Sequence, residues 1–173
     1  MSTRLDLSKL SLMDALDLAK LIELEAYRRY KMFASQLGRR GGDDPGAFFA
    51  TMAENEAKHG RELEARRKAL FGDAPARLTL DDLFDVEAPE MGAPHRGMSL
   101  VQAFEVGLEA EKKAHDFYDM ALPGITNPEV QELFTELRDE ETEHMEMLRE
   151  AMAKLPPTAS EEIEFDIDEA PGL

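Results

Sequence analysis

Apolar residues recur at spacings of three and four along four segments of the chain, and this spacing predicts four amphipathic helices. Glycine and proline mark the ends of these segments: Gly38 follows the first, Gly72 follows the second, and Pro123 follows the third. Asn127 and Pro128 together form a typical helix start before the fourth. The expected helices cover residues 12–37, 45–71, 99–122 and 127–155.

The connection between the second and third predicted helices, residues 72–98, contains several prolines and glycines and is too long for a hairpin turn. A connection of this length can return along the whole bundle, so the second and third helices can run parallel. The sequence thus predicts an all-α fold, a four-helix bundle with a long crossover. We assign residues 1–155 to the bundle and residues 156–173, whose charged side chains are all acidic, to a C-terminal tail.

The inward stripes of the first and third predicted helices are apolar except for one central glutamate each. These glutamates are Glu23 and Glu111, and a tyrosine follows each of them seven residues later. Tyr30 and Tyr118 are therefore either core aromatics or hydrogen-bond donors to the glutamates, since the spacing of two turns lets a hydroxyl reach a carboxylate.

The stripes of the second and fourth predicted helices carry a Glu-x-x-His pair at the same place. The pairs are Glu56 with His59 and Glu141 with His144, so the chain resembles one helical hairpin written twice. The same spacing also places Arg66 on the second stripe. A single Glu-x-x-His pair is weak evidence, because a glutamate-rich helix more often presents such a pair to water.

Four carboxylates at one level of an apolar core require a compensating positive charge, because burying a lone ionised carboxylate costs several kcal/mol. Arg66 lies nearly three turns, roughly 15 Å, from Glu56 and is too distant to supply it. Two divalent cations would supply it, with the carboxylates and one imidazole per metal as ligands. Oxygen and imidazole nitrogen together suit iron or manganese and could accept zinc.

Composition narrows the remaining possibilities. The formal net charge of −17 disfavours a nucleic-acid partner and an anionic membrane surface, since both would repel the chain. No cysteine is present, which excludes disulfides and Cys-ligated metal centres within these residues. The N-terminal residues lack the apolar core of a secretory signal, and we expect a cytoplasmic protein.

The ligand pattern resembles the rubrerythrin branch of the ferritin-like superfamily over most of residues 12–155. The resemblance rests on these pairs in order and spacing: Glu23 with Tyr30, Glu56 with His59, Glu111 with Tyr118, and Glu141 with His144. It implies a ferritin-like fold, a non-haem centre of two iron ions, oxidation of iron by peroxide or oxygen, and a homodimer. Without cysteine there is no rubredoxin domain, so an external electron donor protein is implied. Rubrerythrins also tend to carry an extra glutamate where this chain has Leu108, so the six-ligand set is closer to ferritin and bacterioferritin.

Three functions remain open from the sequence. The first is a di-iron oxidoreductase that reduces peroxide or oxygen, with Glu23, Glu56, Glu111 and Glu141 as its catalytic carboxylates. The second is a ferroxidase or iron-handling protein without peroxidase turnover. The third, which leaves the buried carboxylates unexplained, is a metal-free helical scaffold.

Overall fold

The predicted helices are present in a computed structural model of the chain, which describes residues 10–37, 45–79, 81 and 98–160. The first two helices begin and end where the sequence predicted, and the last two are one to three residues shorter in total. Two short 3-10 turns accompany them. The elements are α1 (Leu12–Leu37), α2 (Pro45–Phe71), α4 (Leu100–Ala121), η2 (Leu122–Gly124), α5 (Pro128–Ala153) and η3 (Pro157–Ser160).

Side-chain caps fix the starts of the helices. The Ser11 hydroxyl accepts a hydrogen bond from the backbone N–H of residue 14, at 3.1 Å, at the start of α1. Ser99 and Gln102 form a reciprocal capping box before α4, and Asn127 caps α5 through the free N–H groups of its first turn. After α2, Gly72 adopts φ 57°, a left-handed conformation that ends the helix at little cost only for glycine.

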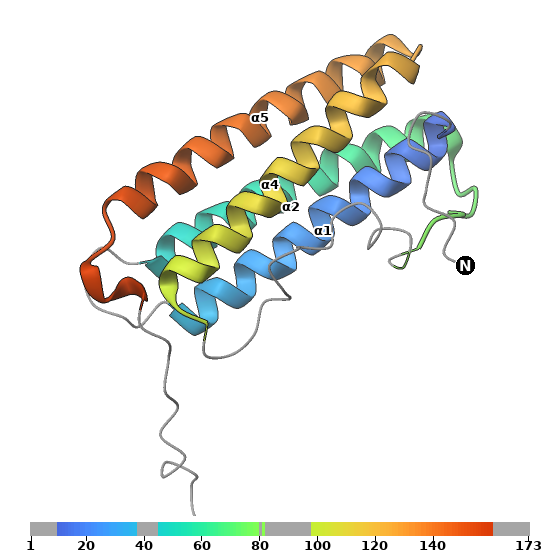
Figure 1. Ribbon diagram of the computed structural model, residues 1–173. Coiled ribbons are helices and arrows are strands. Elements are labelled where there is room, and N and C mark those ends of the chain that lie inside the picture. Colours follow the sequence, from blue (N-terminus) through green and yellow to red (C-terminus); the bar gives the residue numbers. More distant parts are fainter. Residues whose placement is uncertain (1–9, 38–44, 80, 82–97, 161–173) are drawn as a thin grey trace, which may run out of the picture.

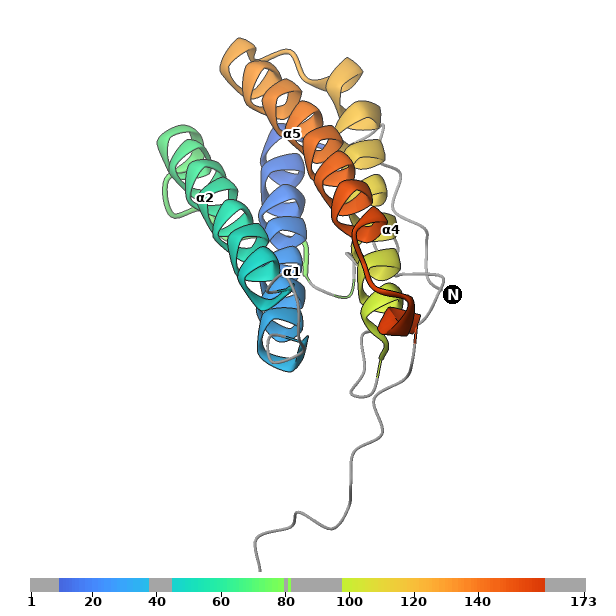
Figure 2. The same cartoon turned by 90° about the vertical axis from the view of Figure 1, so that its left-hand side faces the viewer.

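The four helices form two antiparallel hairpins that lie against each other. Figure 1 shows α1 beside α2, and α4 beside α5, with α2 and α4 running in the same direction. The view in Figure 2 separates the two hairpins and shows the long axis that they share. The predicted crossover bundle is therefore confirmed, although most of the connection itself, 82–97, lies outside the described residues. Within the part of the chain that the structure describes, no helix combines the length and apolarity needed to cross a membrane.

The apolar core is divided into two clusters, one toward each end of the bundle. One cluster contains Phe33, Phe49 and Phe104, and the other contains Phe117 and Phe134, all of them at most 2% exposed. Edge-to-face ring contacts tie each cluster together, such as Phe33 with Phe49 at 5.1 Å between centroids. Between the two clusters lies a polar level. This arrangement encloses the level in apolar side chains above and below.

The structure corrects the predicted stripe of α2 near its C-terminal end. Arg66 lies at the surface and pairs with Glu129 at 2.8 Å, whereas Arg67 is buried and contacts Asp17 through two nitrogens, at 2.8 and 3.1 Å. The reason is geometric: a straight helix has 3.6 residues per turn, so its inward face drifts from a strict seven-residue pattern by about 20° per heptad. After two heptads the next residue has taken the inward place.

The chain continues beyond α5 into η3, where Ala159 is buried. This turn covers the first residues of the predicted tail. The remainder of that tail, 161–173, lies outside the described residues.

Candidate metal centre

Six side chains from all four helices meet at the polar level between the two apolar clusters. Each is at most 4% exposed, so the group is screened from water. The structure thus brings together every residue that the sequence proposed as a ligand: Glu23, Glu56, His59, Glu111, Glu141 and His144.

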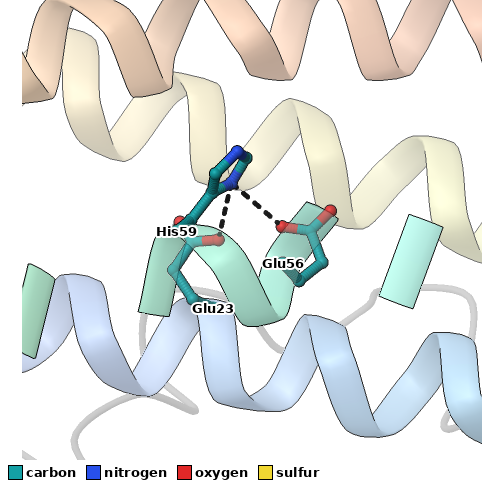
Figure 3. Close-up of side chains that lie close together, drawn as sticks. All are labelled: Glu23, Glu56 and His59. Atoms are coloured by element: carbon teal, nitrogen blue, oxygen red, sulfur yellow. Dashed lines mark hydrogen bonds and ion pairs between the residues drawn. The ribbon is translucent and has the colours of Figure 1, made fainter. Parts of the chain in front are cut away.

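The first half of the group is formed within the α1–α2 hairpin. His59 Nδ1 lies 3.3 Å from Glu23 Oε2 and 3.5 Å from Glu56 Oε2. Figure 3 shows Glu23 reaching across from α1 to the Glu56–His59 pair on α2. One ligand atom from each of these residues lies within 4.8 Å of the others, a spacing compatible with a common metal ion.

The second half combines the other hairpin with Glu56. His144 Nδ1 lies 3.2 Å from Glu56 Oε1 and 3.3 Å from Glu111 Oε2, and these three residues form a second group within 4.8 Å. Glu141 Oε2 is 3.4 Å from the same nitrogen. Glu56 is therefore shared, one oxygen facing each imidazole, which is the arrangement of a carboxylate that bridges two cations.

The hydrogen bonding of this group is incomplete in a way that suits metal ions. Both oxygens of Glu56 and Oε2 of Glu141 are buried and accept no hydrogen bond. Buried polar atoms without partners are rare and call for an explanation such as an ion. Carboxylate oxygens and imidazole nitrogens are ligands that iron, manganese and zinc accept. The residues present therefore fit a pair of divalent cations.

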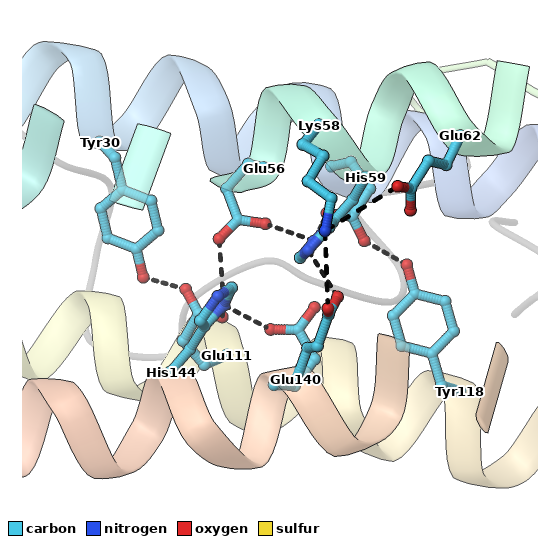
Figure 4. A network of polar contacts seen from close by, with 11 residues as sticks. Tyr30, Glu56, Lys58, His59, Glu62, Glu111, Tyr118, Glu140 and His144 are labelled. Atoms are coloured by element: carbon cyan, nitrogen blue, oxygen red, sulfur yellow. Dashed lines mark hydrogen bonds and ion pairs between the residues drawn. The ribbon is translucent and has the colours of Figure 1, made fainter. Parts of the chain in front are cut away.

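Two buried tyrosines connect the hairpins at this level. The Tyr118 hydroxyl donates to Glu23 Oε1, and the Tyr30 hydroxyl donates to Glu111 Oε1. Burial and the nearby carboxylates raise the pKa of both phenols well above 10, so both remain donors. Each tyrosine thus orients a glutamate on the opposite hairpin, leaving that glutamate's second oxygen facing a histidine (Figure 4).

Without metal, the group balances its charge with protons. Burial raises the pKa of Glu23 to about 8 and that of Glu141 well above its usual range. Burial opposes charge on the imidazoles, but contact with Glu23 and Glu56 outweighs it and raises the pKa of His59 to about 10. The pKa of His144 is raised for the same kind of reason. Burial alone would raise the pKa of Glu56 as well, but its two imidazole neighbours hold it well below the usual range.

Sequence analysis missed one member of the network. Glu140 Oε2 lies 2.6 Å from His59 Nε2, on the side of the ring that faces away from the carboxylates, and Lys58 lies 4.0 Å from the other oxygen (Figure 4). A carboxylate at that position orients the ring so that Nδ1 faces the site. Glu140 is half-exposed and off the inward stripe. The duplicated hairpin gave no hint, because Asn55 occupies the corresponding place.

A comparison with protein families supports this interpretation of the residues. The Rubrerythrin family model matches residues 14–152 and, in a second match, residues 102–166. A search of curated proteins found no match.

Similar folds occur among solved structures. An uncharacterised conserved protein from Magnetospirillum magnetotacticum MS-1 is 27% identical, with a TM-score of 0.69 over 85% of this chain and 97% of that one. A dodecameric thioferritin, the bacterioferritin-related protein from Bacteroides fragilis, is 21% identical, with a TM-score of 0.66 over 87% and 88%. A hypothetical protein from Pyrococcus furiosus is 20% identical, with a TM-score of 0.61 over 86% and 94%. The latter two show the fold alone.

Proposed function

Because the chain belongs to the rubrerythrin family, we propose that it is a non-haem di-iron oxidoreductase that oxidises Fe(II) pairs with peroxide or oxygen. In this proposal its main reaction is peroxide reduction, with electrons from an external donor. The observation that carries the proposal is the shared carboxylate: two groups of three ligands, each with its own imidazole, have Glu56 in common. A single-metal site would need only one such group.

The six residues divide by position between two metal ions. Glu23 and His59 would hold one ion, Glu111 and His144 the other, and Glu56 both. Glu141 lies beside His144 and has a buried oxygen without a donor, so it is the natural second bridge or an added ligand to the second ion. When bound, an iron pair supplies two electrons, one from each ion, which matches the two-electron reduction of a peroxide.

The protein's own contribution is geometry and exclusion of water. Tyr118 and Tyr30 hold Glu23 and Glu111 in place by hydrogen bonds, and Glu140 holds the ring of His59. The apolar clusters on both sides keep the level dry, which strengthens electrostatic interactions inside it.

Metal analysis of Glu56→Ala tests the proposal. Protein purified without chelator and loaded anaerobically with Fe(II) should bind about two ions per chain. Glu56→Ala should bind one or none, because both groups lose their common ligand. Glu54→Ala is the matched control, since Glu54 is an exposed glutamate on the same helix, and it should bind as wild type does. Full occupancy in Glu56→Ala would refute the shared-ligand arrangement, and well under two ions in wild type would favour the metal-free scaffold.

A ferroxidase or iron-handling function is the second candidate. It is favoured by one observation: these residues include no cysteine, so the chain has no Cys-ligated electron carrier of its own. Peroxide consumption measured with and without an added reductant separates the two functions. An oxidoreductase consumes peroxide over many cycles when a reductant is supplied, whereas a ferroxidase stops once its Fe(II) has been oxidised.

A further inference from the structure

A groove on the α1–α2 hairpin leads to the metal-ligating carboxylates. It has a volume of about 520 Å3, and its floor includes Glu23 and Glu56. Leu24 and Tyr27 from α1 and Ala57 from α2 contribute apolar wall, and Leu24 is one of the few large apolar side chains that the described part of the chain exposes. Lys20 and Glu64 form an ion pair from one helix to the other at the groove.

The size of the groove exceeds what the smallest oxidants need. Dioxygen and hydrogen peroxide are close to water in size, about 30 Å3 in the liquid. Pockets for small organic ligands are roughly 300–1,000 Å3 and mostly apolar, with a few polar groups at one place. The groove matches the second description, and its polar place is the pair of carboxylates on its floor.

Gly60 lies in the groove, directly after the ligand His59, and neither backbone geometry nor packing explains it. Among the described residues, only Gly72 has a positive φ. A Cβ at Gly60 would meet only the Cβ of Glu23, at 3.9 Å, which is an ordinary contact. Gly107 differs, since a Cβ there would crowd Tyr30 at 3.4 Å. Glycine in a helix interior is unfavourable, so the open space at Gly60 has another use.

The duplicated hairpin shows what fills that position when it is not open. Met145 follows His144 as Gly60 follows His59, and Met145 is buried. The two hairpins therefore carry equivalent ligands but differ in bulk beside them. The glycine leaves space beside the stem of Glu23, so that this side chain has room to move when a ligand approaches from the groove.

We propose that this groove is a substrate site and that it takes small organic hydroperoxides, ROOH. The apolar R group lies against Leu24, Tyr27 and Ala57, and the O–OH end approaches Glu23 and Glu56 past Gly60. This inference rests on the proposed function, whose Fe(II) pair supplies the electrons. The O–O bond breaks, two Fe(II) become two Fe(III), and two protons are taken up: ROOH + 2 Fe(II) + 2 H⁺ gives ROH + H2O + 2 Fe(III).

The first test is binding without turnover. The full chain loaded with Zn(II), which is diamagnetic and redox-inert, is titrated with 2-phenyl-2-propanol, the alcohol product of cumene hydroperoxide, while backbone amide NMR signals are recorded. Saturable shifts should centre on Leu24, Tyr27 and Gly60. Gly60→Met, which copies the other hairpin, should abolish them. Thr142→Met is the control, because Thr142 is the exposed counterpart of Ala57 beside the other Glu-x-x-His pair, and it should bind as wild type does.

The second test compares two peroxides on the iron-loaded protein. In Gly60→Met, kcat/KM for cumene hydroperoxide should fall by about tenfold or more relative to hydrogen peroxide, because added methylenes occupy the site of the R group. A melting temperature at or above that of wild type, expected when glycine leaves a helix interior, excludes unfolding as the cause.

The two tests separate this inference from the proposed function. Absence of saturable shifts in wild type, or an equal fall for both peroxides in Gly60→Met, would overturn the groove as a substrate site. If the chain takes up no metal, the proposed function fails, and the alcohol titration of the chain as purified still decides whether the groove binds an organic ligand.

Discussion

Metal binding at the buried group should release about four protons at pH 7. In the metal-free chain, the pKa is about 8 for Glu23 and about 10 for His59, and it is raised for Glu141 and His144 as well. At pH 7 all four groups therefore hold a proton. Two divalent cations bring four positive charges to the same place, and the ligand atoms must be deprotonated to coordinate them.

The magnitude follows from linkage. Each proton released makes the apparent binding constant rise tenfold per pH unit, or about 1.4 kcal/mol. Four protons make the overall constant for binding two ions rise about 10⁴-fold per pH unit near pH 7, or roughly 5 kcal/mol. Above pH 8 Glu23 has lost its proton before metal arrives, so the release should fall to about three by pH 9.

Isothermal titration calorimetry with Zn(II) measures this release directly, because the observed heat changes with the ionisation enthalpy of the buffer in proportion to the protons released. Zn(II) avoids oxidation during the titration. The prediction is about four protons per two ions at pH 7 and about three at pH 9. A release of one proton or fewer at pH 7 would refute the charge balance, and with it the claim that buried protons take the place of the cations.

Three further outcomes are expected. Tyr118→Phe removes the donor to Glu23 and should weaken metal affinity by about 10- to 100-fold, measured by competition with a chelator, while a change under threefold would contradict the positioning role. Phe134→Ala, at a fully buried position, should lower the free energy of unfolding by about 3–5 kcal/mol in urea, whereas a loss under 1 kcal/mol would mean that the apolar cluster is loosely packed. In chelated protein, the raised pKa values of Glu23 and His59 give stability that is full below their unfolded values and is lost as pH rises through about 8 and 10, so the melting temperature should fall from pH 7 to 10, and a flat profile would contradict the shifts.

Two aspects stay predictions that the structure leaves untested. The external electron donor and the homodimer both come from the family resemblance. The first follows from the lack of cysteine in these residues, and the second from the usual assembly of rubrerythrins. Sedimentation velocity over a range of concentrations tests the homodimer, which a monomer at every concentration would exclude.

The helices and the ligand set could be predicted from the sequence because both are written in local spacing. Glu56 and His59 are three residues apart, and that spacing alone places them on one face of a helix. The caps at Ser11 and Asn127 are equally local. The error at Arg66 has the same origin, because a strict seven-residue pattern ignores the slow drift of a straight helix, which brings Arg67 inward instead.

Tertiary structure decided everything that depends on how the hairpins meet. Sequence spacing could not assign the shared role to Glu56, because His59 belongs to its own helix but His144 lies 88 residues away on α5. The contact of Glu140 with His59 and the groove beside Gly60 depend in the same way on the relative placement of separate helices. The sequence by itself determined which residues turn inward, since a helix repeats over a few residues. Only packing of one hairpin on the other, and of α1 on α2, determined which of those residues touch.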